Sequence, residues 1–235
     1  QGSTATDGQG EADFSGTSVI AYSSLGDLAG SFAFRPAGGA LSGVDIGDAF
    51  GSNDGGRRFR IRYDTPVFNG FSLALSAGEE VLSSGNDNEF YDVGLKYARD
   101  YEDVKVDARL GFAKVDGNQG QSVGSLALLH KPTGLNAALA AGSDQENDDD
   151  YVYLKLGYIQ DWFAFGSTAI SLDFYEGDDF AIAGSDSSSV GLALVQRIDE
   201  SNLEVFATYR TYSFDSSGTD FEDIDVVALG ARWKF

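Results

Sequence analysis

The chain has 235 residues with 30 glycines, three prolines and 13% aromatic side chains, a composition that suits strands and turns better than a helical bundle. It has no cysteine, which excludes a disulfide framework or a zinc knuckle, and its net charge of −21 argues against a nucleic-acid partner, because a polyanion would be repelled. No apolar run of about 18 residues is present to form a membrane-spanning helix, but a spanning strand needs only about 9–11 residues.

The first 56 residues hold seven acidic residues against Arg35 alone, and we expect them to form a long loop region. From Arg57 onward the sequence is typical of one long meander, and residues 1–235 are expected to form a single domain. The predicted strands lie near residues 57–64, 71–78, 89–99, 104–115, 121–131, 135–142, 150–160, 165–176, 188–199, 203–213 and 224–235.

The connectors between these strands alternate in kind along the chain. One set is short: residues 65–70, 100–103, 132–134, 161–164 and 200–202. The other set is mostly longer, and four of its intervals hold 18 acidic residues and no Lys or Arg: residues 79–89, 143–150, 176–186 and 214–225. Short turns at one end and long loops at the other are typical of an outer-membrane β-barrel.

Several strands alternate apolar and polar residues with period two. A soluble sheet with one face on a core would also alternate, but here the second face carries charges of both signs with Gly, Ser and Ala, as a water-filled lumen would. Several predicted strands have ten residues or more, above the globular average of about 5–6. Aromatic residues gather near strand ends, where a membrane-interface girdle would lie: Tyr63, Phe71, Tyr97, Tyr151, Tyr158, Trp162, Phe163, Phe174, Tyr209 and Trp233. We therefore predict an all-β fold, a transmembrane antiparallel up-and-down β-barrel.

Three basic residues, here called the arginine row, share one face of the first strand: Arg58, Arg60 and Arg62. They are about 6.6–6.8 Å apart, and they repel one another unless they are hydrated or face carboxylates. A pore interior offers both, although an exposed sheet face would also solvate them. Further candidates for inward-facing basic residues are Lys96, Lys105, Arg109, Lys155, Arg210 and Arg232.

In the last strand, apolar residues at alternate positions lead to Trp233 and Phe235, while Arg232 and Lys234 lie on the other face. A terminal aromatic residue behind such a pattern resembles the C-terminal signature of outer-membrane barrel proteins, which the assembly machinery reads in that group. An ordinary edge strand that ends at Phe235 is the alternative.

The stretch Arg57–Leu73 resembles the strand–turn–strand that follows the constriction loop in general diffusion porins of Gram-negative bacteria. Gly2–Gly8 and Phe14–Val19 resemble the preceding loop region of alphaproteobacterial members. The resemblance covers essentially the whole chain and depends on the order of these elements. It implies a sixteen-stranded porin, homotrimeric in the outer membrane and in contact with lipid and lipopolysaccharide. It also implies passive diffusion of small hydrophilic solutes and ions, without enzymatic activity or a cofactor.

In that family the long third loop folds into the barrel and narrows it, and acidic residues on the loop face a basic cluster on the wall. Residues 4–56 match the loop in position. The resemblance therefore implies a pore constriction in which Asp45, Asp48 and Asp54 face the arginine row. The opposed charges would make a transverse field that favours small polar solutes.

The strand count makes a further prediction. The strand at 57–64 precedes a short turn of the periplasmic type, so it runs toward that side of the membrane, and the last strand does too. A closed antiparallel barrel whose two chain ends share one side needs an even number of strands, so these eleven strands alone cannot close it. Sixteen strands would require five more before residue 57, which residues 1–56 cannot supply, so we expect this chain to lack N-terminal strands. The alternative is a complete twelve-stranded barrel that recruits residues 17–23 or 30–35 as one strand.

Other functions find weaker support. The acidic run at 144–150 could hold Ca²⁺ loosely, although it lacks the central Gly of an EF-hand loop and a solvated loop is the alternative; its candidate ligands are Asp144, Glu146, Asp148 and Asp150. The single histidine, His130, lies beside a predicted turn and gives no support to a Ser–His hydrolase. Two rivals stay open: a non-conducting structural or adhesive barrel with acidic surface loops, and a soluble secreted calcium-binding β protein.

Overall fold

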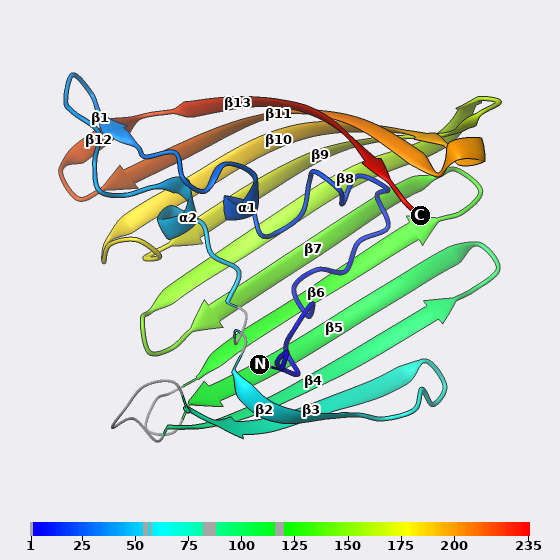
Figure 1. The fold of residues 1–235 in the computed structure, drawn as a ribbon, viewed down its shortest axis with the longest axis horizontal. Helices are drawn as coiled ribbons and strands as arrows, with labels where there is room; N and C mark the ends of the chain where they lie inside the picture. The colour runs from blue at the N-terminus through cyan, green and yellow to red at the C-terminus, as the bar shows by residue number, and fades with distance from the viewer. Residues whose placement is uncertain (1, 54–55, 57, 82–87, 116–119) are drawn as a thin grey trace.

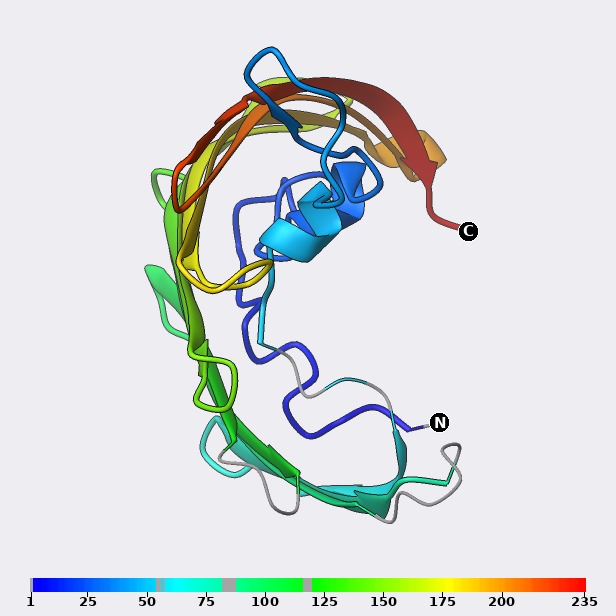
Figure 2. The same cartoon turned by 90° about the vertical axis from the view of Figure 1, so that its left-hand side faces the viewer.

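The computed structural model describes residues 2–53, 56, 58–81, 88–115 and 120–235. Within these residues, one antiparallel sheet of 13 strands curves around a segment formed by the N-terminal residues (Figures 1 and 2). Among these residues, no helix has the length and apolar character needed to cross a membrane.

All eleven predicted strands are present, and each long strand is antiparallel to its neighbour in chain order. They are β2 (Phe59–Asp64), β3 (Phe71–Glu79), β4 (Glu89–Asp100), β5 (Val104–Val115), β6 (Gln121–His130), β7 (Leu135–Asp144), β8 (Asp149–Phe163), β9 (Gly166–Asp178), β10 (Ser185–Ile198), β11 (Leu203–Ser216) and β13 (Ile224–Trp233). Two short strands, β1 (Arg35–Pro36) and β12 (Thr219–Glu222), pair with each other at one rim. A 3₁₀ turn, η1 (Asp199–Ser201), joins β10 to β11.

Several predicted connectors are shorter than expected, and two of them illustrate the reason. Strand β8 continues to Phe163 across a register shift after Gln160, which leaves only residues 164–165 as the turn that was predicted at 161–164. Strands β7 and β8 pair as far as Asp144 and Asp149, so the acidic loop at 143–150 contains only residues 145–148. Because acidic residues have low strand propensity, the prediction ended β7 and β8 before the aspartates that these strands in fact include.

Neither segment proposed to complete a twelve-stranded barrel does so. Residues 17–23 form turns, and of residues 30–35 only Arg35 enters a strand, the two-residue β1. Among the described residues, β2 and β13 lie at opposite edges of the sheet and do not pair, and Figure 2 shows the open arc between them. The twelve-stranded alternative is therefore wrong for these two segments.

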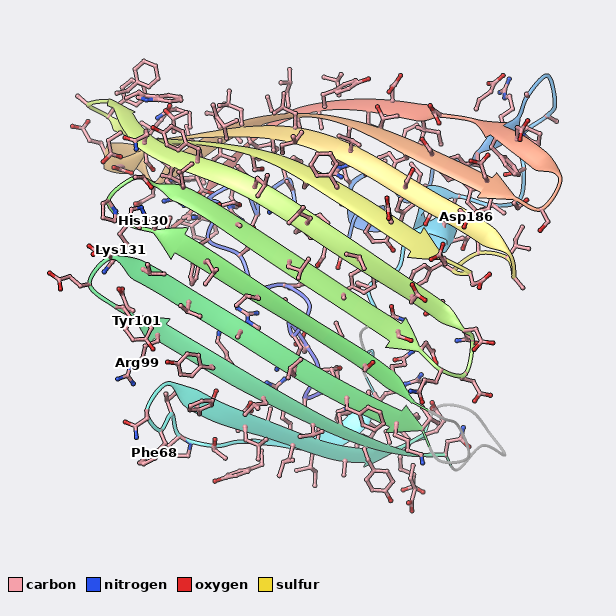
Figure 3. All side chains as sticks on the ribbon, turned by 180° about the vertical axis from the view of Figure 1, so that it is seen from behind. Phe68, Arg99, Tyr101, His130, Lys131 and Asp186 are labelled. Carbon is pink, nitrogen blue, oxygen red and sulfur yellow. The ribbon has the colours of Figure 1, made fainter. Side chains whose placement is uncertain are left out.

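The two faces of the sheet differ as the alternation predicted. Figure 3 shows the convex face, which carries apolar side chains along the middle of every long strand, with Ile61 83% and Leu229 78% exposed. Phe68, Tyr101 and Lys131 mark the end with the short turns, and Asp186 marks the opposite end. Alternate residues of the same strands face the concave side, where many polar side chains are buried.

The inner segment, residues 2–53, runs along the concave face (Figure 2). Its two short helices, α1 (Gly26–Ala29) and α2 (Ile46–Ala49), pack on aromatic side chains that point inward from β8, β9 and β11. Tyr151 belongs to this core and is buried, so its predicted place in a membrane-interface girdle is wrong. The error arises because Tyr151 lies on the inward-facing register of β8, as Asp149 and Tyr153 do.

Candidate functional site

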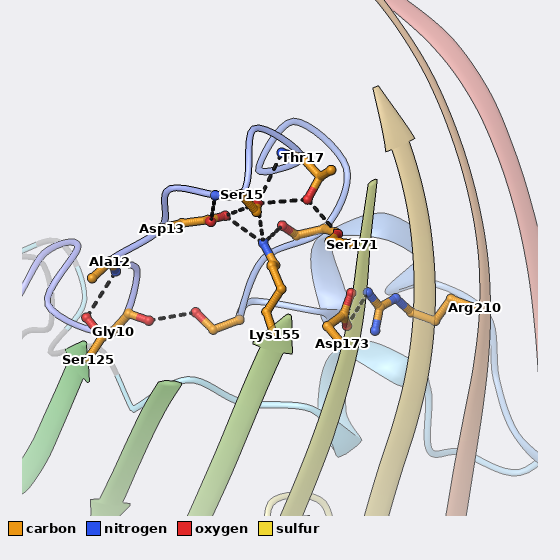
Figure 4. Close-up of polar contacts among 12 residues, drawn as sticks. Gly10, Ala12, Asp13, Ser15, Thr17, Ser125, Lys155, Ser171, Asp173 and Arg210 are labelled. Atoms are coloured by element: carbon orange, nitrogen blue, oxygen red, sulfur yellow. Dashed lines mark hydrogen bonds and ion pairs between the residues drawn. The ribbon is translucent and has the colours of Figure 1, made fainter. Parts of the chain in front are cut away.

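A buried lysine connects the inner segment to the sheet, here called the wall, at the middle of the concave face (Figure 4). Lys155 lies on β8 with its side chain 1% exposed, and its Nζ donates to Asp13 Oδ2 at 2.6 Å and to the Ala21 carbonyl at 2.5 Å. The Asp13 carboxylate also accepts from the Ser15 backbone N–H at 2.6 Å, which fixes the local turn. The wall thus supplies the cation and the inner segment supplies the anion.

A second ion pair continues this row across the neighbouring strands. In the register of the sheet, Lys155 is opposite Asp173, Asp173 is opposite Gly191, and Gly191 is opposite Arg210. Because Gly191 has no side chain, the Arg210 guanidinium lies over it and reaches Asp173 with an Nη2–Oδ1 distance of 2.7 Å. Asp13, Lys155, Asp173 and Arg210 therefore form a buried row of alternating charge that is neutral in sum, here called the charge ladder.

Hydroxyl groups fasten the inner segment on both sides of the charge ladder. Ser125 on β6 donates to the Gln9 carbonyl at 2.6 Å and accepts from the Ala12 N–H at 3.0 Å. On β9, Ser171 bonds Thr17 through their hydroxyls at 2.6 Å. Farther along, the hydroxyls of Tyr175 and Tyr212 donate to the carbonyls of Gly51 and Leu25. The segment is held across strands β6 to β11, so it is part of the rigid interior.

The arginine row points to the concave side, as predicted, while Phe59, Ile61 and Tyr63 are exposed on the convex side. Each arginine pairs with a carboxylate of the wall: Arg58 with Glu80 at 3.3 Å, Arg60 with Asp92, and Arg62 with Asp64 at 2.8 Å. Arg62 also donates to the Thr4 carbonyl of the inner segment at 2.5 Å.

The loop acids predicted to face the arginine row lie in a different setting. Asp45 and Asp48 form the reciprocal capping box of α2, in which Asp45 Oδ1 accepts from the Asp48 N–H at 3.0 Å. This arrangement satisfies donors at the helix N-terminus. Asp48 is exposed and Asp45 is half-buried and, among the described residues, neither has an ion pair with the arginine row. Asp54 lies outside the described residues.

The other predicted inward basic residues all face the concave side and pair with acids that sequence reasoning missed. Asp107 receives Lys96 at 3.2 Å and Arg109 at 2.7 Å. Glu204 receives Arg232 at 2.6 Å, and Asp100 receives Lys105 at 3.6 Å. A signal for Asp107 was available, because it lies two residues from both Lys105 and Arg109 on the same face of one strand.

The remaining predicted residues lie at the strand ends. Asp144 accepts from Gln121, Asn147 and the Glu146 N–H, so its oxygens are occupied by donors. Among the described residues, no group of three or more His, Cys, Asp or Glu is arranged to hold a metal ion. At the chain end, Trp233 is exposed on the convex face and its ring lies 5.9 Å from that of Phe235. His130, at the β6–β7 turn, bonds Thr133 at 2.7 Å.

Comparisons with known proteins agree with this architecture. The family described as Gram-negative porin matches residues 4–217. An anion-selective porin from Comamonas acidovorans is similar in fold, with a TM-score of 0.50 and 13% identity, over 75% of this chain and 59% of that chain. OmpT, an outer-membrane protein of Vibrio cholerae in a form with one loop deleted, has a TM-score of 0.46 and 11% identity over 74% of this chain and 62% of that one. A comparison with curated proteins finds no match. The chain thus spans about three fifths of the length of the Comamonas protein.

Proposed function

The chain belongs to the Gram-negative porin family, and from that premise we propose that it forms the wall of a water-filled channel for passive diffusion of small hydrophilic solutes and ions. Family membership confirms the expected outer-membrane location and the expectation that the chain is not an enzyme. The finer assignment to a sixteen-stranded alphaproteobacterial type is supported only by the resemblance of residues 2–8, 14–19 and 57–73.

One observation carries the proposal: a single layer of strands has an apolar convex face and an ion-paired concave face. On β10, for example, Leu192 and Leu194 are exposed outward, while Ser189 and Gly191 face inward beside Arg210. A soluble sheet would bury its apolar face and expose its charged one. The opposite arrangement matches lipid outside and water with polar groups inside.

The inner segment is proposed to narrow the channel from within. Its support is the set of contacts described above, which fix residues 2–53 against β6 to β11 and leave Arg58 and Arg62 partly exposed on the facing part of the wall. Arg60 is fully buried against Asp92, so its charge is neutralised by the wall. We therefore assign the electrostatic part of the constriction to Arg58 and Arg62, with the role of Asp45 and Asp48 resting on the family resemblance alone.

Planar-bilayer recording of the purified chain tests the channel. We expect stepwise conductance, whereas a structural or adhesive barrel with a blocked lumen would give none. Replacing Arg58 and Arg62 with Gln should shift the reversal potential in a KCl gradient toward cation preference, since Glu80 and Asp64 then lose their counter-charges. Arg99→Gln is the matched control, because Arg99 lies at the short-turn end of the convex face. An equal shift in the control would contradict the assignment of Arg58 and Arg62.

A homotrimer in contact with lipid and lipopolysaccharide is proposed from the family resemblance. The exposed apolar face of the sheet supports the lipid contact. Cross-linking of outer-membrane fractions would show a species of three chains, and a monomer at all cross-linker concentrations would contradict the trimer.

A further inference from the structure

A polar cavity of about 380 Å³ lies between the inner segment and strands β7 and β8. Tyr153 and Lys155 line it from the wall, and Glu11, Asp13 and Tyr22 line it from the inner segment. Its volume falls at the lower end of the range for small-molecule sites, about 300–1,000 Å³. The cavity is formed by the same segment that we propose to narrow the channel, so a solute in transit passes beside it.

One polar atom in this cavity wall has no partner within the described residues. Tyr153 is 3% exposed, and its hydroxyl makes no hydrogen bond there. A buried hydroxyl without a partner costs about 1–3 kcal/mol, whereas one that binds a solute hydroxyl is satisfied. Two inward tyrosines nearby, Tyr175 and Tyr212, bond carbonyls of the inner segment. Of the two tyrosines that line the cavity, Tyr22 and Tyr153, it is therefore Tyr153 whose hydroxyl has no partner among the described residues.

The charges of the cavity decide the ligand class. Lys155 already contacts Asp13 at 2.6 Å, so its ammonium is matched. Asp13 and Lys155 neutralise each other, and Glu11 has an interaction of its own, so neither an anion nor a cation finds a free counter-charge in this lining. Carboxylates accept hydrogen bonds and a tyrosine hydroxyl both donates and accepts, which suits a neutral ligand with several hydroxyls. The rings of Tyr22 and Tyr153 offer apolar faces for its C–H groups.

We propose that this cavity is a binding site for a small neutral polyhydroxylated solute of monosaccharide size, with Tyr153 as the residue that determines its specificity. The inference rests on the proposed channel only for how the solute reaches the cavity. Binding at this site would hold a sugar beside the narrow part of the channel and raise its local concentration there.

Saturation-transfer NMR on the full chain in detergent tests the proposal with D-glucose as the probe. We expect glucose to bind more tightly than its charged analogues glucosamine and gluconate. Tyr153→Phe should weaken glucose binding by about 2- to 10-fold, because it removes one hydrogen bond and keeps the ring. Ala140→Leu, which fills the cavity from β7, should abolish it. Tyr158→Phe, on the convex face, is the control and should leave binding unchanged.

Bilayer conductance measured on the same variants separates the two proposals. A chain that conducts but shows no glucose signal refutes the binding site and leaves the proposed channel intact. A chain that binds glucose but does not conduct refutes the channel and leaves the binding site intact. Undiminished binding by Tyr153→Phe, or tighter binding of either charged analogue, would overturn the assignment.

Discussion

The ion pair between Lys155 and Asp13 determines how firmly the inner segment is held. Lys155→Met keeps the apolar stem of the side chain but leaves the Asp13 carboxylate, 11% exposed, without its cation. Breaking a buried pair from one side costs about 3–5 kcal/mol. Because the Ser15 N–H and hydroxyl still donate to Asp13, we expect the lower end, a loss of about 3 kcal/mol in the free energy of unfolding.

Urea unfolding in lipid vesicles, followed by tryptophan fluorescence, measures this loss. The double variant Lys155→Met/Asp13→Asn removes both charges and should recover part of it, with a coupling energy of about 0.5–3 kcal/mol between the two positions. Lys131→Met is the matched control, since Lys131 pairs with Asp100 at the same kind of distance, 2.7 Å, on an exposed turn. That pair should contribute under about 1 kcal/mol. Equal losses for Lys155→Met and Lys131→Met, or strict additivity in the double variant, would refute a stabilising role of the Lys155–Asp13 pair.

Three further predictions test the faces and the end of the sheet. Leu192→Arg, at a convex position that is 51% exposed, should cost about 2–4 kcal/mol in vesicles if lipid covers it; a cost near zero in vesicle unfolding would contradict a lipid-facing surface. Gly191→Ala should lower stability in the same assay, because the added Cβ would lie 2.3 Å from Nη2 of Arg210 and displace the guanidinium from Asp173; unchanged stability would show that Arg210 moves freely. Phe235→Ala should reduce the folded yield in cells but leave the stability of refolded protein unchanged, because Phe235 is fully exposed; equal yields would argue against an assembly signal.

The strands could be predicted because alternation is a local property. Strand β5 has the predicted limits of residues 104–115, and it alternates from Val104 to Phe112. Where the pattern changes, as at the register shift after Gln160, the prediction failed by a few residues. The inward direction of the arginine row followed from the same period of two, which fixes the face of every residue once one is known.

The partners of those residues could not be predicted in the same way. Arg60 reaches Asp92 across strand β3, where Ser76 lies between them, so the contact depends on two registers at once. Lys155 and Asp13 are 142 positions apart, and nothing periodic marks the path of the inner segment. Contacts between an irregular segment and a sheet depend on the folded three-dimensional structure, so such side-chain pairs leave no local pattern in the sequence.

The position of the acidic residues changes what the net charge of −21 means for the channel. Five aspartates lie directly opposite one another on consecutive strands β8 to β12: Asp150, Asp178, Asp186, Asp215 and Asp220. All five are exposed, and two rows farther along the convex face the residues are Leu154, Phe174 and Val190. Like charges directly opposite in a sheet are destabilising, and only water at high dielectric makes such a row tolerable. The lipid-covered band must therefore end between these rows.

Many of the acidic residues thus lie in water at the rim of the sheet away from the short turns, while the described basic residues of the concave wall are paired with carboxylates of the wall or of the inner segment. In the proposed channel, we therefore expect ion preference to depend on the few partly exposed charges of the arginine row and not on the sum over the chain.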